Sequence, residues 1–541
     1  MNHMMYMPLM ISDAIVHAGR HHGRTEIVTR CVEGGLHRYT YRDCERRSRQ
    51  LASMLGKLDV KFGDRVGTLA WNTYRHLEIY FGTSGSGAVC HTVNPRLHLD
   101  QIAYIVNHAN DRVVFFDLTF LPLVEQLAQH CPRVEKWVAL AERAAMPASS
   151  KLDLLCYEDL IASVSPISTW PTFDERNPSA LCYTSGSTGS PKGVMYTHRS
   201  TLLHCYAAAM PDSLSCSAKD VIMPVVPMFH VNAWGFPYIA AMVGAKLVLP
   251  GPNNDSESLY ALLEEERVTF AAGVPTVWID MLRYVEDTGA KFSSLRRIVI
   301  GGATTPPVLR ESCRIAGIHA FPAWGMTETS PVGTCGTLLA RHQDLLEEAR
   351  ERVLDKQGRA LFGIDMKISA GKGTEQPWDG ESCGELMVRG HWVVGEYFGQ
   401  ADTALESGWF PTGDVATIDA DGYLQITDRL KDVIKSGGEW ISSIDIENIA
   451  ASHPGVSMAA CVSLPHPKWG ERPVVFVVRR PESKVSRDEM LSFYSGRIAK
   501  WSIPDDVIFI DAMPINATGK IQKMRLREML AESGVKAACV D

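Results

Sequence analysis

The chain has 541 residues, of which 45% are hydrophobic and 21% are charged, and its formal net charge is −8. This is the composition of a folded protein with several units, and the acidic balance argues against a nucleic-acid-binding protein. The thirteen cysteines show neither a C-x-x-C pair nor zinc-ligand spacing, and no basic segment precedes the apolar stretch at the N-terminus. We therefore expect a cytoplasmic protein without a signal peptide.

The predicted elements alternate between strands and helices. Residues 38–58 are typical of a strand followed by an amphipathic helix, and residues 76–95 of a buried helix followed by a short strand. The strand–turn–helix order recurs at 268–282 and 296–317. Further single strands are predicted at residues 64–72, 111–117 and 135–141. This order predicts an α/β fold with mostly parallel sheets, whose ligand sites lie beyond the carboxyl ends of the strands.

The apolar stretch Val221–Ala245 contains no Asp, Glu, Lys or Arg and is long enough to span a bilayer. It is interrupted by Pro224, Pro227 and Pro237 and by the polar His230. Such breaks leave backbone groups that lipid cannot satisfy. We therefore predict buried strand or loop pieces and the start of a buried helix, and no membrane span.

The pattern changes from about Glu385, where short strands are broken by Gly and Asp residues. Asp421–Gly422 lies between two apolar runs and predicts a hairpin. A new unit begins within residues 429–442, and a helix is predicted over residues 486–501. The last hundred or so residues therefore read as a small α+β domain, a size typical of an independent domain.

The segment YTSGSTGSPKGV, residues 183–194, combines glycines, hydroxyl side chains and one lysine. Glycines allow backbone N–H groups to converge on an anion, and a lysine adds a point charge suited to phosphate. Lys192 is followed by Gly193, so the segment is not a Walker A motif. A flexible linker is the alternative, but the apolar runs on both sides favour a phosphate-binding loop.

Six stretches follow one another in a characteristic order: residues 183–194, 227–235, 301–306, 323–331, 408–442 and 514–523. Together they resemble the adenylate-forming superfamily of acyl-CoA synthetases, peptide-synthetase adenylation domains and luciferases. The resemblance covers nearly the whole chain. It implies a large N-terminal domain, residues 1–430, of two α/β subdomains and a β-barrel, followed by a small mobile α+β lid domain, residues 431–541.

The resemblance implies ATP and CoA as co-substrates and Mg²⁺ as the metal. A carboxylate attacks the α-phosphorus of ATP, so cations and positioned donors carry the catalysis. Thr327 would bind the α-phosphate, and Glu328 would hold the metal. Lys520 would bridge the carboxylate and the α-phosphate. A basic surface helix is the alternative for the segment that carries Lys520. The implied nucleotide site comprises Thr184, Ser185, Gly186, Ser187, Thr188, Gly189, Lys192, Trp324, Gly325, Thr327, Asp414 and Arg429.

Within this site the resemblance assigns adenine stacking to Trp324 and the ribose hydroxyls to Asp414, since a carboxylate accepts paired hydrogen bonds. Arg429 would contact ribose or phosphate, with a surface ion pair as the alternative. The implied acyl pocket comprises His230, Trp234, Gly301, Gly302 and Ala303. Ordinary core packing is the alternative for His230 and for Trp234. The implied hinge is Asp432, and the implied CoA tunnel comprises Lys435, Gly437, Glu439 and Trp440.

The substrate is predicted to be an acid without an amino group. Phe229 and His230 stand where amino-acid adenylation domains usually carry an Asp, and an unpaired buried ammonium would be costly. The N-terminal half resembles the branch that activates 3-methylmercaptopropionate, so we expect that acid or a short to medium fatty acid, with a long-chain acid as the alternative. A CoA-independent adenylating enzyme and a non-catalytic nucleotide-binding regulator also remain open. A homodimer is expected from the relatives.

Overall fold

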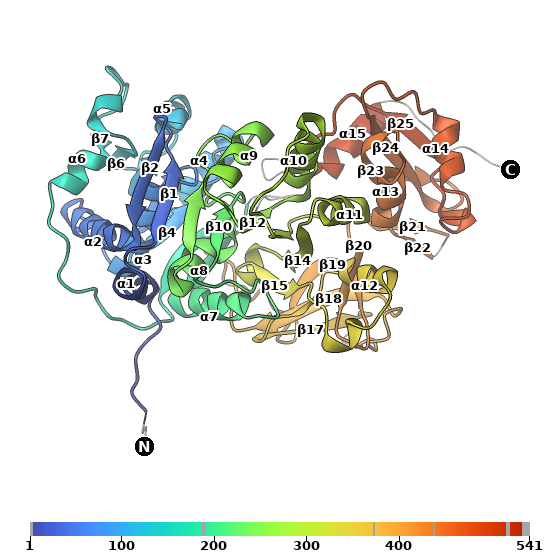
Figure 1. The fold of residues 1–541 in the computed structure, drawn as a ribbon, viewed down its shortest axis with the longest axis horizontal. Coiled ribbons are helices and arrows are strands. Elements are labelled where there is room, and N and C mark those ends of the chain that lie inside the picture. The colour runs from blue at the N-terminus through green and yellow to red at the C-terminus, as the bar shows by residue number, and fades with distance from the viewer. Residues whose placement is uncertain (1–3, 185–190, 372–373, 438, 516–519, 533–541) are drawn as a thin grey trace.

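The structure, a computed structural model, describes residues 4–184, 191–371, 374–437, 439–515 and 520–532. Mixed α/β sheets form the first part of the chain, and a separate C-terminal domain follows them (Figure 1). This agrees with the predicted fold class. Across these residues, no helix is both long enough and apolar enough to cross a membrane.

The first large sheet has seven strands in the order β7-β6-β5-β3-β4-β8-β9, and only its edge strand β9 is antiparallel to its neighbour. The strands are β3 (Arg65–Leu69), β4 (Val89–Thr92), β5 (Val113–Phe116), β6 (Lys136–Ala139), β7 (Leu154–Cys156), β8 (Pro178–Tyr183) and β9 (Gly193–Thr197). The parallel strands are almost wholly buried, as expected for a sheet covered on both faces. The predicted phosphate loop connects β8 to β9.

The second large sheet has nine strands in the order β16-β15-β14-β13-β12-β10-β11-β1-β2, and its central strands are parallel. The strands are β1 (Glu26–Arg30), β2 (Leu36–Thr40), β10 (Val221–Pro224), β11 (Lys246–Leu249), β12 (Phe270–Gly273), β13 (Arg297–Ile300), β14 (His319–Gly325), β15 (Val332–Cys335) and β16 (Arg359–Ala360). The prediction of mostly parallel sheets is confirmed, and the carboxyl ends of β13 and β14 carry two of the six motifs.

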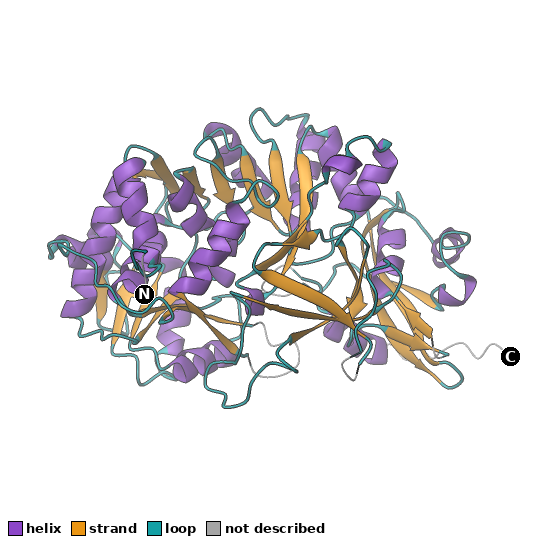
Figure 2. Ribbon diagram, turned by 90° about the horizontal axis from the view of Figure 1, so that it is seen from below, coloured by secondary structure: helices purple, strands orange, loops and turns teal. Residues whose placement is uncertain are grey.

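Helices cover the two large sheets (Figure 2). They are α1 (Ile11–His21), α2 (Tyr41–Lys57), α3 (Tyr74–Ser86), α4 (Leu99–Ala109), α5 (Leu121–Leu127), α6 (Tyr157–Ala162), α7 (His198–Ala209), α8 (Phe236–Val243), α9 (Ser256–Glu265), α10 (Pro275–Thr288), α11 (Pro307–Ile315) and α12 (Glu347–Leu354). Local signals set their ends: Thr40 caps the start of α2, its hydroxyl accepting from the backbone of Asp43, and Gly87, with φ 89°, caps the end of α3. The apolar stretch 221–245 forms buried β10 and α8, as predicted.

The unit predicted as a β-barrel is built on an antiparallel sheet, β17 (Ile364–Ser369), β18 (Gly384–Gly390), β19 (Phe410–Ile418) and β20 (Leu424–Arg429). The predicted hairpin joins β19 to β20, and Gly422 takes φ 82° there, which an L side chain rarely adopts. A bridge between Arg359 and Tyr423 ties this sheet to β16.

The C-terminal domain has its own sheet and core. Its elements are β21 (Ile434–Ser436), β22 (Glu439–Ile441), α13 (Ser443–Ala451), β23 (Val456–His466), β24 (Gly470–Arg479), α14 (Arg487–Phe493), β25 (Asp506–Phe509) and α15 (Lys523–Glu532). The helix predicted over 486–501 is too long, because α14 ends at Phe493 and Gly496 takes φ 76°. Ile446, Cys461 and Val475 lie in the core of this domain.

Candidate active site

The base of the phosphate loop is held closed by its two ends. The backbone N–H of Thr184 donates to the carbonyl of Lys192 (2.9 Å), and the N–H of Lys192 donates to the hydroxyl of Thr184 (3.2 Å). The ammonium of Lys192 lies 4.6 Å from the centre of the Tyr397 ring, within cation–π range. The predicted ligands Ser185, Gly186, Ser187, Thr188 and Gly189 lie outside the described residues.

A tight turn at the carboxyl end of β14 presents Thr327 and Glu328. Gly325 is required at its start, because a Cβ there would lie 1.9 Å from the carbonyl oxygen of Pro331. The carbonyl of Thr327 accepts from the Tyr196 hydroxyl (2.7 Å), and Oε1 of Glu328 accepts from the Tyr397 hydroxyl (2.9 Å). Burial raises the pKa of the Glu328 carboxyl, and the bond from Tyr397 opposes that rise.

Asp414 is buried between two partners. Its carboxylate accepts from the indole N–H of Trp324 (2.8 Å) and pairs with Nε of Arg429 (2.9 Å), which lies opposite it in the β19–β20 register. The Trp324 ring also packs against Gly333, where a Cβ would lie 2.6 Å from it. The ion pair considered for Arg429 therefore exists, and its partner is the predicted ribose ligand.

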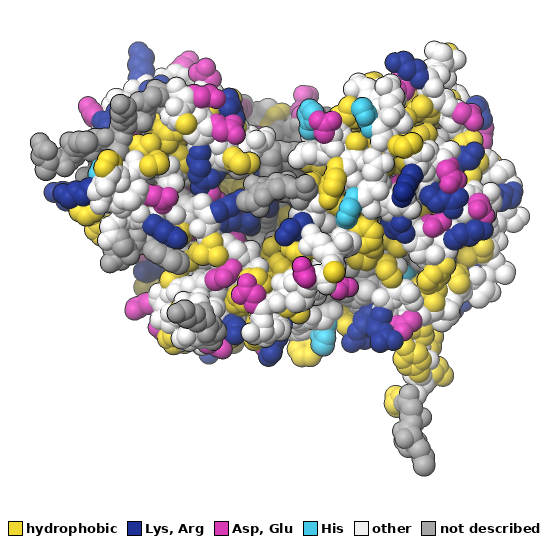
Figure 3. Space-filling model, turned by 180° about the vertical axis from the view of Figure 1, so that it is seen from behind, with side chains coloured by type: hydrophobic (Ala, Val, Ile, Leu, Met, Phe, Trp, Pro, Cys, Tyr) yellow, Lys and Arg dark blue, Asp and Glu magenta, His cyan; other side chains and the backbone are white. Residues whose placement is uncertain are grey.

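Lys520 reaches from the C-terminal domain to the loop after β13. Its Cε lies 3.7 Å from the position that a Cβ would take on Gly302, and the Trp234 ring lies 4.0 Å from the same position. Burial and the positive charge of Arg429 lower the pKa of Lys520 to about 8, against the opposite effect of Asp414 and Glu328. Seen from behind, the molecule is hollowed between its two parts, and Lys and Arg side chains gather beside the hollow (Figure 3).

The predicted acyl-pocket residues lie on two facing segments. The Trp234 ring is 3.0 Å from the position that a Cβ would take on Gly301, and Ala303, two residues further along the same loop, is exposed. His230 is neutral, because burial and the charge of Lys520 lower its pKa to about 3. This packing alone is compatible with either a channel wall or a core contact for Trp234.

The segment that carries Trp234 has an unusual backbone. Asn232, Ala233 and Trp234 take φ values of 52°, 48° and 56°, in the left-handed region that non-glycine residues rarely adopt. A run of such residues persists only where the surrounding packing enforces it, and such strain gathers at ligand sites. The sequence carries no glycine or asparagine pattern that would have predicted the whole run.

The predicted CoA-tunnel residues form a second group, in the β21–β22 hairpin. The backbone of Lys435 donates to Glu471 (2.8 Å) and that of Gly437 to the carbonyl of Trp469 (2.8 Å). Glu439 and Trp440 lie on β22, and their side chains are outside the described part of the chain. Asp432, the predicted hinge, accepts from the guanidinium of Arg527 on α15 (2.6 Å).

The donor set suits a metal that arrives with its substrate. No group of three or more His, Cys, Asp or Glu side chains in the described ranges could hold a metal ion. Glu328 is one carboxylate at the end of β14, and Mg²⁺ is commonly held by one or two carboxylates together with substrate phosphates. Glu328 would therefore fit Mg²⁺ only together with the phosphates of ATP.

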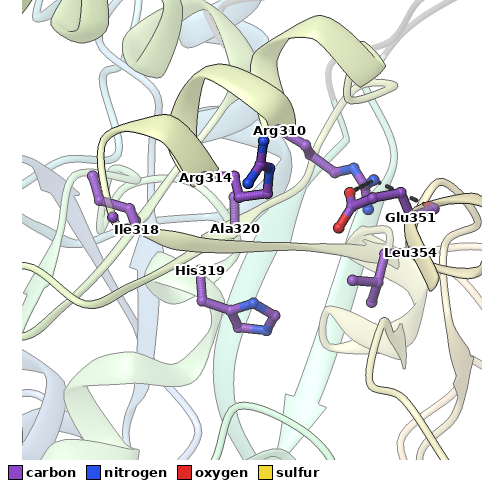
Figure 4. A pocket seen from close by; sticks show the side chains of 8 residues that line it. Arg310, Arg314, Ile318, His319, Ala320, Glu351 and Leu354 are labelled. Carbon is purple, nitrogen blue, oxygen red and sulfur yellow. Dashed lines mark hydrogen bonds and ion pairs between the residues drawn. The ribbon is translucent and has the colours of Figure 1, made fainter. Parts of the chain in front are cut away.

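A separate hollow lies at the other end of β14 (Figure 4). It is lined by Arg310, His319 and Glu351 among others, and Arg310 pairs with Glu351 across it. His319 and Gly325 are the two ends of the seven-residue strand, so this hollow is about 20 Å from the turn that carries Glu328. The predicted site residues lie elsewhere.

Comparisons with known proteins agree with this architecture. Residues 16–398 match the AMP-binding enzyme family, and residues 445–520 match the AMP-binding enzyme C-terminal domain. The chain is 50% identical to a 3-methylmercaptopropionyl-CoA ligase of Ruegeria lacuscaerulensis (97% of this chain, 98% of the relative) and 48% identical to a medium-chain fatty-acid–CoA ligase of Ectopseudomonas oleovorans (97% and 96%). The fold matches an anthranilate CoA ligase solved with anthranoyl-AMP, with a TM-score of 0.86, 23% identity and coverage of 97% and 99%. The chain therefore belongs to the AMP-binding enzyme family, and the predicted membership of the adenylate-forming superfamily is confirmed.

Two tyrosines at the site were not predicted. Tyr196 on β9 donates to the carbonyl of Thr327, and Tyr397, in the loop between β18 and β19, donates to the carboxylate of Glu328. Both tyrosines are distant in sequence from this turn. Neither has a local signal, since a tyrosine beside apolar residues is typical of ordinary core packing.

Proposed function

We propose that the protein is an ATP-dependent, AMP-forming acid–CoA ligase. It joins a carboxylic acid to AMP with release of pyrophosphate, and then transfers the acyl group to the thiol of CoA. The observation that carries this proposal is the placement of Lys520 beside Gly302 and Trp234, with Asp414 and Glu328 among the charges that act on it. A cation between a nucleotide site and an acyl pocket is what adenylation of an acid requires.

In the first step, the backbone and hydroxyl groups of the phosphate loop and Lys192 hold the β- and γ-phosphates. Thr327 and Lys520 bind the oxygens of the α-phosphate, and the lysine also orients the attacking carboxylate. Asp414 holds the ribose, with Trp324 and Arg429 fixing its orientation. Mg²⁺ held by Glu328 would supply charge neutralisation for the departing pyrophosphate.

In the second step, the C-terminal domain turns about Asp432 and removes Lys520 from the site. Lys435, Gly437, Glu439 and Trp440 then line the path of the CoA thiol. The β21–β22 hairpin supports this assignment, because Gly437 takes φ 62° and offers its backbone without a side chain. We place the boundary between the nucleotide- and acid-binding domain, residues 1–430, and the lid domain, residues 431–541, at this hinge.

The substrate that we propose is 3-methylmercaptopropionate or a short to medium-chain fatty acid. The identity to the Ruegeria and Ectopseudomonas ligases supports these acids. In this proposal the Trp234 indole, which packs against Gly301, closes the acyl channel and so favours a short acid. Neutral His230 offers no negative charge to an α-ammonium, which disfavours an amino acid.

The test is AMP release by the purified protein with ATP and Mg²⁺, with and without CoA, across 3-methylmercaptopropionate and straight-chain acids of increasing length. CoA-dependent turnover is expected, with the highest kcat/KM for a short acid. A preference for long-chain acids would replace the proposed substrate. AMP release at the same rate with and without CoA would indicate a CoA-independent adenylating enzyme. ATP binding without turnover would indicate a nucleotide-binding regulator.

We also propose a homodimer that acts in the cytoplasm, where ATP and CoA are available. The proposal of a dimer draws on the relatives alone. The molar mass of the purified protein, measured by light scattering, tests it: a value near twice 59.8 kDa is expected, and a monomer over the assay's concentration range would refute it.

A further inference from the structure

One short segment of the β-barrel unit joins the two loops that would face the triphosphate. The backbone N–H of Val394 donates to the carbonyl of Glu328 (2.8 Å), and the N–H of Phe398 donates to the carbonyl of Gly193 (2.8 Å). Residues 394–398 therefore bridge the turn after β14 and the strand after the phosphate loop. These two backbone bonds help to fix the spacing between the loops, beside the bond from Tyr196 on β9 to the carbonyl of Thr327.

Tyr397 lies within this bridge and contacts a functional side chain on each side. Its hydroxyl donates to Oε1 of Glu328 (2.9 Å), and its ring lies 4.6 Å from the ammonium of Lys192. Hydrogen bonds to an ionised carboxylate are stronger than neutral ones, and a cation over a tyrosine ring is attracted by its face. A single side chain thus fixes a carboxylate and an ammonium at once.

The contacts matter because the two charges would otherwise attract each other. The positive charge of Lys192 acts to lower the pKa of the Glu328 carboxyl, yet no ion pair joins these two residues, both of which the structure describes. A direct pair would close the space between the carboxylate and the phosphate loop. Tyr397 offers each group a different partner and so keeps them apart.

We propose that Tyr397 is a positioning residue that holds Glu328 and Lys192 apart in the ligand-free site, so that the phosphates of ATP and their divalent cation can enter between them. This inference rests on the proposed function, because it assigns the phosphates to Lys192 and the cation to Glu328. Tyr397 itself takes no part in the chemical step.

Two substitutions separate its contacts. Tyr397→Phe removes the hydroxyl and keeps the ring under Lys192, whereas Tyr397→Leu removes both. The matched control is Tyr423→Phe, which removes another phenol of the β-barrel unit; it donates to the carbonyl of Thr337 (2.6 Å) and bonds to neither Glu328 nor Lys192 in the described part of the chain. The readout is the Kd of ATP from calorimetry, with Mg²⁺ and with EDTA, beside KM and kcat for AMP formation.

For Tyr397→Phe we expect the Kd of ATP with Mg²⁺ to rise about tenfold, about 1.4 kcal/mol, while the Kd in EDTA stays within about twofold. For Tyr397→Leu both Kd values should rise, and for Tyr423→Phe neither should. In KM and kcat, the loss for Tyr397→Phe should fall mainly on the KM for ATP. Unchanged Kd values, or equal losses with and without Mg²⁺, would overturn the inference.

A double-mutant cycle keeps the result interpretable if Tyr397→Phe also lowers the melting temperature. In a Glu328→Gln background the hydroxyl has no carboxylate to hold, so adding Tyr397→Phe should change the Kd by less than about twofold. A full additional loss would show that the hydroxyl acts elsewhere, and would also overturn the inference. If the parent protein binds ATP but makes no AMP with any acid, the proposed function fails, whatever Tyr397 does.

Discussion

Replacing Lys520 by alanine tests whether its ammonium serves only one of the two half-reactions. Lys520 lies beside Gly302 and Trp234 in this arrangement of the lid domain, where an acid and the α-phosphate would meet. We expect Lys520→Ala to slow formation of the acyl-adenylate strongly. Thioester formation from a supplied acyl-adenylate should be spared, because in the proposed mechanism the lid removes the lysine before CoA reacts.

The size of the effect follows from the environment of the ammonium. Its pKa is lowered from 10.5 to about 8, chiefly by burial. At about 1.36 kcal/mol for each pKa unit, the surroundings of Lys520 disfavour the charge by about 3 kcal/mol. The bound triphosphate reverses this, because its negative charge attracts the ammonium. Loss of one such preorganised group typically lowers kcat about 10²- to 10³-fold, and we expect this loss in the first half-reaction.

The assay measures pyrophosphate release for the first half-reaction and acyl-CoA formation from synthetic acyl-adenylate for the second. Lys520→Met is the matched control for volume, since it removes the charge and keeps an unbranched chain. Its melting temperature without ligand should be no lower than that of the parent, because a disfavoured charge is gone. Equal losses in both half-reactions for Lys520→Ala would refute the alternation of the lid.

The remaining predictions concern specificity, pH and the ribose. Trp234→Ala should raise kcat/KM for longer acids relative to short ones. The rise should be about fourfold for each methylene newly buried, because burial of one methylene contributes about 0.8 kcal/mol. An unchanged chain-length profile with the fold intact would show that Trp234 is a core residue. Because the proposed role of Lys520 needs its ammonium form, kcat/KM for ATP should fall as the pH rises through about 8, and Lys520→Arg should remove this alkaline limb. If the limb persists in Lys520→Arg, another group titrates. Asp414→Asn should raise the KM for ATP about tenfold or more with a smaller effect on kcat, since the charged acceptor that we propose for the ribose is lost. An unchanged KM would remove Asp414 from the proposed nucleotide site.

The order and type of most elements could be predicted because their signals are local. Apolar runs of strand length, amphipathic periodicity and capping residues such as Thr40 act within a few positions of the chain. The hairpin at Asp421–Gly422 is of the same kind. The helix predicted over residues 486–501 was too long, because the apolar pattern continues past Phe493 although the chain turns at Gly496.

The sequence by itself determined the family and predicted the residues of the site, because the six motifs are contiguous stretches whose resemblance to the family is visible without the fold. Only the tertiary structure decided which of them meet. Lys520 reaches Gly302 from another domain, Trp324 and Arg429 converge on Asp414, and Tyr397 connects Glu328 with Lys192. These contacts join segments far apart in the chain, and the packing of whole sheets sets them, so no local pattern can encode them.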